Sequence, residues 1–333
     1  MGIIAIAANP ASGKDIRRLV SHATNFDNAE KTNIIERIIL ALDAFGRHDI
    51  YFMPERYNFM NRVRQKILDK DKDYTVNHIM QPYPDFTNTL EDTTLFAQQM
   101  AEKGADVLIV LGGDGTSRAA AKSCGALPLI PISTGTNNVY PDVLEGTLAG
   151  IAAAYIASGA TLSDACYTIS KAIHIAINGQ EKDIALVDAV VTNEAFAASK
   201  ALWRINSIKK AIVTQAHPSN IGFSSFIGSQ IIILPRDPLG AVADIDTVNP
   251  NAKVALAAGV ITTCRIDNLT PLSLGQPYSF IPDYNGMIAL DGERELPFSA
   301  GDQLTFTITL DGPKKIEVYQ TIELAQRNHF FKV

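Results

Sequence analysis

The residues with the clearest potential for chemistry follow an apolar run of strand length, residues 106–111. The run ends abruptly in a turn with three glycines in four positions, and a helix-forming stretch, residues 117–122, comes next. Glycines let backbone N–H groups approach a bulky anion such as phosphate. Asp114 is the only charge in the turn. Asp-Gly is a common turn dipeptide, but a plain turn does not explain the neighbouring glycines and threonine, so we interpret Asp114 as a base or a contact to a hydroxyl or metal. The turn consists of Gly112, Gly113, Asp114, Gly115 and Thr116.

A second glycine- and threonine-rich turn, residues 133–141, follows another short apolar run, residues 128–132. In a doubly wound parallel sheet, ligands bind outside the edge formed by the carboxyl ends of the strands. Both turns are therefore predicted to lie at that edge. The two asparagines can be turn formers, since Asn tolerates left-handed backbone, but after a Thr-Gly-Thr sequence we predict ligand contact. The predicted contacts are Thr134, Gly135, Thr136, Asn137 and Asn138.

The first strand pattern, residues 3–8, ends in a loop that contains Gly13 and Lys14. This loop is not a P-loop, because Ala8 stands where the P-loop has its first glycine and Asp15 replaces the final Ser or Thr. A loop that touches phosphate and a plain turn both remain open.

A late acidic turn, Asp291 to Glu293, follows the strand pattern of residues 287–290. It can be a hairpin turn of the Asp-Gly type, or a pair of carboxylates that faces a cleft. The six histidines are scattered, without the spacing of metal ligands.

The first half of the chain alternates strand patterns with helix patterns. Continuous apolar runs bounded by Gly or Pro indicate buried strands, and apolar residues at helical spacing indicate helices with one buried face. This alternation predicts a doubly wound parallel sheet. The expected helices span residues 30–45, 59–68, 89–103 and 144–157, and the expected strands span residues 3–8, 50–53, 74–80, 106–111 and 128–132.

Strand patterns dominate beyond residue 160, separated by Gly, Pro, Asn and Asp. We therefore predict an α/β nucleotide-binding domain, residues 1–142, followed by a β-rich, β-sandwich-like substrate domain, residues 143–319. The segment 320–333 is expected to pack back on the first domain. The expected strands of the second domain span residues 167–177, 185–192, 230–234, 253–266, 287–290 and 303–310, with one helix-like stretch at 193–203.

The composition limits the class of protein. A length of 333 residues fits two domains, and 47% hydrophobic and 19% charged residues are typical of a soluble protein. The net charge of −6 lacks the electrostatic footprint of nucleic-acid binding. The three cysteines are far apart, which argues against disulfides and thiolate metal sites, and no apolar run has the length of a membrane span. We expect a cytoplasmic homo-oligomer that binds neither nucleic acid nor membrane.

The Gly-Gly-Asp-Gly-Thr turn resembles the signature of the superfamily that joins ATP-NAD kinases with diacylglycerol and sphingosine kinases. The first loop, with Asn9 and Ser12, is similar to that of the lipid-kinase branch, and Asp291 to Glu293 resembles the late element of both branches. Residues 132–141 look like the AcoX branch, the NAD kinase-like proteins associated with acetoin catabolism. The resemblance runs across nearly the whole chain and implies an NAD kinase-like fold with the active site between its two domains.

The resemblance also implies phosphoryl transfer from ATP, usually with Mg²⁺, to a hydroxyl group. Asp114 would activate the acceptor, the glycines would contact phosphates, and Glu293 is the second candidate base. NAD kinases carry an Asn-Glu pair where this chain has Val187 and Asp188, so Asp188 is the predicted dinucleotide contact, and the acceptor is NAD or a smaller metabolite. The alternative is a non-catalytic NAD- or ATP-binding accessory or regulatory protein of acetoin catabolism. A lipid kinase is a third hypothesis.

Overall fold

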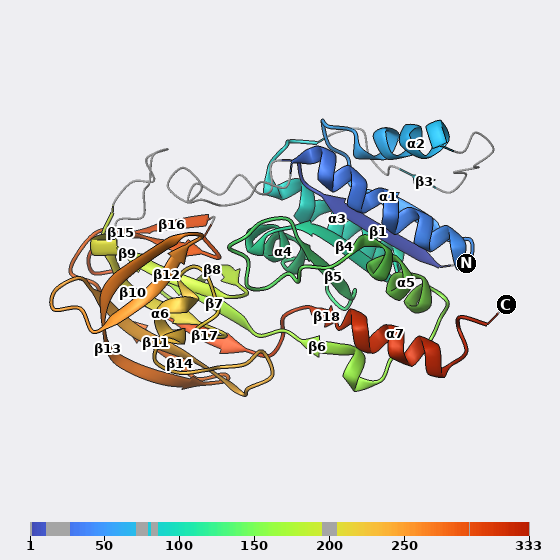
Figure 1. Ribbon diagram of the computed structural model, residues 1–333. Coiled ribbons are helices and arrows are strands. Elements are labelled where there is room, and N and C mark those ends of the chain that lie inside the picture. Colours follow the sequence, from blue (N-terminus) through green and yellow to red (C-terminus); the bar gives the residue numbers. More distant parts are fainter. Residues whose placement is uncertain are drawn as a thin grey trace.

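The computed structural model describes residues 2–10, 27–70, 79–80, 86–194, 205–292 and 294–332, which form two parts (Figure 1). One part is a mostly parallel sheet with helices on both faces, and the other consists mainly of antiparallel strands. The predicted fold class is therefore confirmed. Within these residues, no helix has the length and apolarity that crossing a membrane requires.

The first sheet has seven strands in the order β3-β2-β1-β4-β5-β18-β6. Its first five strands pair in parallel, so their carboxyl ends lie at one edge. The core strands β1 and β4 are almost completely buried, which explains their continuous apolar sequences. The strands are β1 (Ile3–Ala8), β2 (Asp49–Phe52), β3 (Ile79–Met80), β4 (Val107–Gly112), β5 (Leu129–Ser133), β6 (Tyr167–Ile169) and β18 (Lys314–Ile316).

Successive side chains of β1 point to opposite faces of this sheet and enter two different cores. Ile4 and Ile6 pack with helices α1, α2 and α5, whereas Ala5 and Ala7 pack with helix α3 and the end of helix α4. Helices on both faces are what the alternating sequence pattern predicted. The helices are α1 (Asn28–Ala44), α2 (Phe59–Lys70), α3 (Leu90–Lys103), α4 (Asp114–Ala121) and α5 (Gly146–Ala157).

The ends of helix α3 follow directly from its sequence. Thr89 is the N-cap, and its hydroxyl accepts a hydrogen bond from the Glu91 N–H at 3.2 Å. Gly104 ends the helix with a left-handed backbone, φ +77°, which glycine adopts without a steric penalty. Between these caps, helix α3 packs against α4 and β1.

The second part contains two antiparallel sheets, a seven-stranded one in the order β12-β13-β11-β10-β9-β15-β16 and a four-stranded one in the order β14-β17-β7-β8. One apolar core joins the two sheets face to face, and a second core lies between the larger sheet and helix α6. The elements are β7 (Ala172–Ile177), β8 (Gln180–Ala185), β9 (Asp188–Thr192), β10 (Ile208–Val213), α6 (Ser224–Gly228), β11 (Leu239–Asp246), β12 (Ala252–Ala257), β13 (Val260–Ser273), β14 (Pro277–Phe280), β15 (Gly286–Leu290), β16 (Arg294–Phe298) and β17 (Leu304–Thr309), with short 3₁₀ turns at Asp164–Cys166 and Ile205–Ser207.

The chain crosses between the two parts near residue 170 and returns near residue 312. The prediction of one strand over residues 167–177 is wrong, because the run divides into β6 and β7, which belong to different sheets. The two segments that cross are held together, since the Ser170 N–H donates to Pro313 O and the Gly312 N–H donates to Ser170 O, both at 3.0 Å.

Two other strand predictions are corrected by the structure. Residues 253–266 form a hairpin of β12 and β13 rather than one strand, because Gly259, with φ +73°, reverses the chain. Residues 230–234 form no strand and contribute only a single bridge from Ile233 to Ala216. The expected helix-like stretch, residues 193–203, lies outside the described residues from residue 195 onward.

Helix α5 and strand β6 lie in the region assigned to the second domain from sequence, but both belong to the first sheet and its covering helices. The first sheet and its covering helices therefore include elements up to about residue 170. The last helix, α7 (Val318–Arg327), packs against α5 (Figure 1).

Candidate functional site

The first glycine-rich turn joins the end of β4 to the start of helix α4. A Cβ atom on Gly112 would lie 2.4 Å from the Thr116 Cβ, and a Cβ atom on Gly113 would lie 2.7 Å from the Asn138 Oδ1. Gly112 is thus required for close packing inside the turn, whereas a side chain at Gly113 would displace the Asn138 amide of the second turn. Gly115 is buried in the first turn of α4.

Asp114 connects the two turns. Its Oδ1 accepts hydrogen bonds from the Val139 N–H at 3.0 Å and the Tyr140 N–H at 2.8 Å, and its Oδ2 lies 3.2 Å from the Val139 nitrogen. The carboxylate is 7% exposed. Sequence reasoning interpreted Asp114 through a ligand alone, but in the folded protein the same carboxylate also fixes the second turn against the first.

Three threonine hydroxyls near this junction are buried and make no hydrogen bond with the part of the protein that the structure describes. They are the Oγ1 atoms of Thr116, Thr134 and Thr136. Leaving a buried polar group unpaired costs about 1–3 kcal/mol. A hydroxyl can both donate and accept, so this cluster is chemically suited to the oxygen atoms of a ligand.

The second turn is also bound to the antiparallel part. Asn137 Oδ1 accepts a hydrogen bond from the Ala258 N–H, at the tip of the β12–β13 hairpin, at 3.1 Å. Asn138 Nδ2 donates to Ser133 Oγ at 2.8 Å, and Ser133 Oγ donates to Gly135 O at 3.0 Å. Both asparagines, predicted as ligand contacts, therefore have structural partners within the protein.

The late acidic turn, between β15 and β16, is both a hairpin and a buried carboxylate. Asp291 has a left-handed backbone, φ +50°, and is 2% exposed. Its carboxylate accepts three hydrogen bonds of 2.8–3.1 Å, from the N–H groups of Leu186, Val187 and Asp188. Burial raises the pKa of Asp291, although these hydrogen bonds oppose the change. Asp188, the predicted dinucleotide contact, thus lies beside the late acidic turn.

Sequence reasoning missed Arg118, the largest fully buried side chain among those described. Its Nη1 lies 3.6 Å from the Asp183 Oδ2 and 3.4 Å from the Ile184 carbonyl oxygen, and its Nε lies 3.8 Å from the Asp291 Oδ2. Lys122 also binds Asp183, at 2.6 Å. Helix α4, which begins in the first turn, is thereby attached to the late acidic turn. The only sequence signal was a basic residue two positions after the motif.

Asn9 lies at the carboxyl end of β1, on the same sheet edge as the two turns. Its Nδ2 donates to Thr89 O at 3.4 Å, and its carbonyl oxygen accepts from Lys31 Nζ at 2.9 Å. Lys31 is fully buried and was also missed from sequence. Ser12 and Glu293 lie outside the described residues.

Within the described residues, no group of three or more His, Cys, Asp or Glu side chains could hold a metal ion. Mg²⁺ needs no such group when it binds with a nucleotide, since substrate phosphates and one or two carboxylates supply its ligands.

Comparisons with known proteins agree with this geometry. The sequence profile of the ATP-NAD kinase N-terminal domain matches residues 4–160, and that of the acetoin catabolism protein X C-terminal domain matches residues 171–320. The crystal structure of yeast NADH kinase, complexed with NADH, covers 98% of this chain and 88% of its own, with a TM-score of 0.53 and 12% identity. The fold is therefore NAD kinase-like.

A curated relative gives the family. Acetoin catabolism protein X of Cupriavidus necator is 32% identical over 341 residues, which cover 99% of this chain and 94% of the relative. The chain belongs to the acetoin catabolism protein X family, an NAD kinase-like branch. The resemblance noted from the two turns is confirmed.

Proposed function

We propose that the protein binds a nucleotide at the junction of its two glycine-rich turns and transfers a phosphoryl group from ATP to an alcohol hydroxyl. The acceptor would be NAD or a smaller metabolite linked to acetoin catabolism. The observation that carries the proposal is the cluster of unpaired hydroxyls of Thr116, Thr134 and Thr136. Phosphate oxygens would supply the hydrogen-bond partners that these hydroxyls lack among the described residues.

The rest of the site supports the same chemistry. The first backbone N–H groups of helix α4 lack intrahelical partners, and the helix dipole favours an anion there. Asp114 would contact the acceptor hydroxyl, and Mg²⁺ would arrive with the nucleotide phosphates. A cytoplasmic location and a homo-oligomeric state also remain proposals.

Nucleotide binding is tested by isothermal titration of ATP and NAD into the wild type and the variants Thr116→Val and Thr134→Val. Each variant should bind ATP about tenfold more weakly, the worth of one good hydrogen bond. Thermal stability should not fall, because neither hydroxyl has a hydrogen-bond partner among the described residues. Thr321→Val is the matched control, since the buried Thr321 hydroxyl in α7 donates to the carbonyl oxygen of Glu317, the N-cap of that helix. Wild-type ATP affinity in both test variants would contradict the proposal.

Turnover is tested by acceptor-dependent release of ADP with NAD and a panel of small alcohols. Asp114→Asn is an informative variant, because the amide oxygen can occupy the position of Oδ1 and keep the bonds to Val139 and Tyr140. Loss of a general base lowers rates about 10²- to 10⁴-fold. Unchanged turnover in this variant would rule out the assigned role of Asp114.

The second candidate function is nucleotide binding without catalysis, in an accessory or regulatory role. It is favoured by the use of both Asp114 carboxylate oxygens in backbone hydrogen bonds, since a carboxylate that accepts N–H donors is a weaker base. Tight ATP binding with no acceptor-dependent ADP would support this function instead of phosphoryl transfer.

A further inference from the structure

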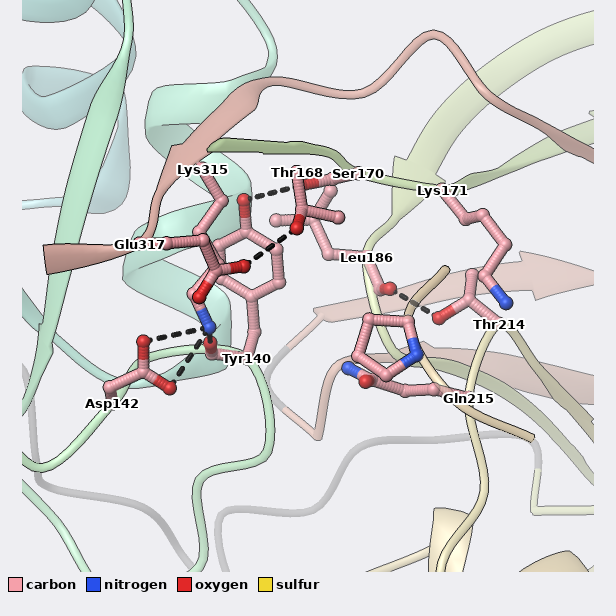
Figure 2. Close-up of a pocket in the computed structure, with 11 residues that line it drawn as sticks. Tyr140, Asp142, Thr168, Ser170, Lys171, Leu186, Thr214, Gln215, Lys315 and Glu317 are labelled. Carbon is pink, nitrogen blue, oxygen red and sulfur yellow. Dashed lines mark hydrogen bonds and ion pairs between the residues drawn. The ribbon is translucent and has the colours of Figure 1, made fainter. Parts of the chain in front are cut away.

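A polar cavity of about 200 Å³ lies beside the turns, where the chain crosses between its two parts (Figure 2). The crossing segment contributes Thr168 and Ser170, and the returning segment contributes Lys315 and Glu317. The facing wall includes Gln215, which follows β10 of the antiparallel part. The space is far larger than the ~15 Å³ that one water molecule needs, but it is suited to a compound much smaller than a dinucleotide.

The two ammonium groups of this cavity are already bound by the protein. Lys171 Nζ donates to three backbone carbonyl oxygens, at distances of 2.8–3.1 Å. Burial lowers the pKa of Lys171 to about 8, so the group still carries its charge at neutral pH. Lys315 Nζ donates to Tyr140 O at 2.7 Å and to the Asp142 carboxylate at 3.0 Å.

The charges of the cavity wall therefore cancel. Among the lining residues, the two cations Lys171 and Lys315 are equalled in number by the carboxylates of Asp142 and Glu317. The nearby Arg236 guanidinium is already bound to Thr168 Oγ1 at 3.1 Å and to Tyr167 O at 3.2 Å. An anionic ligand would meet two carboxylates without gaining an ammonium group of its own. This electrostatic balance disfavours phosphates and carboxylic acids.

The groups that remain available to hydrogen-bond a ligand are a carboxylate oxygen, which can only accept, and uncharged amide and hydroxyl groups. Glu317 Oε1 accepts from the Thr168 hydroxyl at 2.6 Å, while no hydrogen bond within the described protein reaches its Oε2. The Gln215 amide likewise has no side-chain hydrogen bond there, and it can donate and accept. Tyr140 and Ser170 add paired hydroxyls, 2.8 Å apart. A ligand with several hydroxyl groups matches this set.

We propose that this cavity is a binding site for a small uncharged polyhydroxy compound, separate from the nucleotide site at the turns. Glu317 would accept from one ligand hydroxyl, and Gln215 would bind another from the opposite part of the structure. The proposal does not depend on nucleotide binding, because none of its hydrogen-bonding groups is a predicted nucleotide contact.

Binding is measured by saturation-transfer NMR on the full chain, with erythritol as the probe. Glycerol 3-phosphate and 3-amino-1,2-propanediol are the negatively and positively charged compounds used for comparison. Erythritol should give transfer signals that saturate, whereas both charged compounds should bind more weakly. Gln215→Leu and Glu317→Gln should each raise the Kd of erythritol about tenfold. Glu317→Gln keeps an oxygen for the Thr168 bond, so it provides a folded test even if Gln215→Leu is unstable.

Gln276→Leu is the matched control, because Gln276 is exposed in the turn before β14, away from the cavity. It should bind erythritol as the wild type does. The proposal is overturned if the wild type gives no saturable erythritol signal, if both cavity variants bind with wild-type Kd, or if glycerol 3-phosphate binds more tightly than erythritol.

Discussion

Replacing Arg118 by methionine should lower the stability of the protein by the amount that this side chain contributes to the attachment of helix α4 to the antiparallel part. The substitution keeps most of the aliphatic volume but removes the cation that faces Asp183 and Asp291. Asp183 retains Lys122 at 2.6 Å. Asp291 retains its three backbone N–H donors, yet its charge is left buried without a cation.

The magnitude follows from burial and distance. Removing one partner of a buried ion pair costs about 3–5 kcal/mol. Arg118 is 1% exposed, but its distances of 3.6 and 3.8 Å exceed those of hydrogen-bonded ion pairs, so the low end, about 3 kcal/mol, is expected. For a domain of ~200 residues this lowers the melting temperature by about 6–12 °C.

The loss should also depend on pH. Burial raises the pKa of Asp291 above its ordinary value of 3.8, and Arg118 opposes this. Without Arg118 the folded-state pKa rises further, so the native state keeps a proton at pH values where the unfolded state has lost it. Stability then falls as the pH rises from 3.8 through the raised pKa. The deficit of Arg118→Met should be smallest in acid and complete at neutral pH.

Differential scanning calorimetry at pH values of about 4.5 and 7.5 measures both effects. Arg327→Met is the control, since Arg327 forms an exposed ion pair with Glu323 and should lose less than about 1 kcal/mol. Adding Asp291→Asn to Arg118→Met should recover part of the loss, because Asn tolerates the left-handed backbone. A melting temperature within about 2 °C of the wild type, or equal deficits at both pH values, would refute the reasoning.

Three further predictions concern pH and packing. Partial burial lowers the pKa of His174, but the carboxylates of Glu181 and Asp311 outweigh this and hold the pKa above 6.5. In thermal melts, His174→Gln should therefore lose the most stability below pH 6.5 and none above the raised pKa. Burial lowers the pKa of His48 in the folded protein, so the unfolded chain takes up a proton first and acid destabilises the fold. His48→Phe should therefore lose less stability than the wild type as the pH falls below 6.5. A Cβ on Gly286 would lie 2.0 Å from Thr192 O, so Gly286→Ala should cost about 1–3 kcal/mol in urea denaturation.

The first sheet could be predicted from sequence because its strands are buried on both faces. Such strands appear as continuous apolar runs, and Gly or Pro marks their ends. The strand division at residues 170–171 was missed for the same reason, since the apolar pattern continues on both sides. What divides the run is the pairing of each half with a different distant strand, β18 for β6 and β17 for β7, which no local pattern records.

The site was predictable only in its local part. Both turns can be identified in the sequence by their glycine and threonine content. Their protein partners lie far away in sequence: Asp114 binds backbone 25 and 26 residues later, and Arg118 reaches an acceptor 66 residues later. A single sequence carries no signal of such pairings, so Asp114 was interpreted through a ligand alone and Arg118 was overlooked.

Tyr140 shows why the two turns cannot be considered apart from the crossing segments. Its N–H binds Asp114, its hydroxyl lies 2.8 Å from the Ser170 hydroxyl, and its carbonyl oxygen accepts from Lys315. Burial raises the pKa of the tyrosine, so its hydroxyl stays neutral and the link persists across the physiological pH range. The first turn, the segment that leaves the first sheet and the segment that returns to it therefore meet at one residue. The backbone that Asp114 holds is therefore tied directly to both crossing segments, so the position of this carboxylate depends on these segments as well as on the turn.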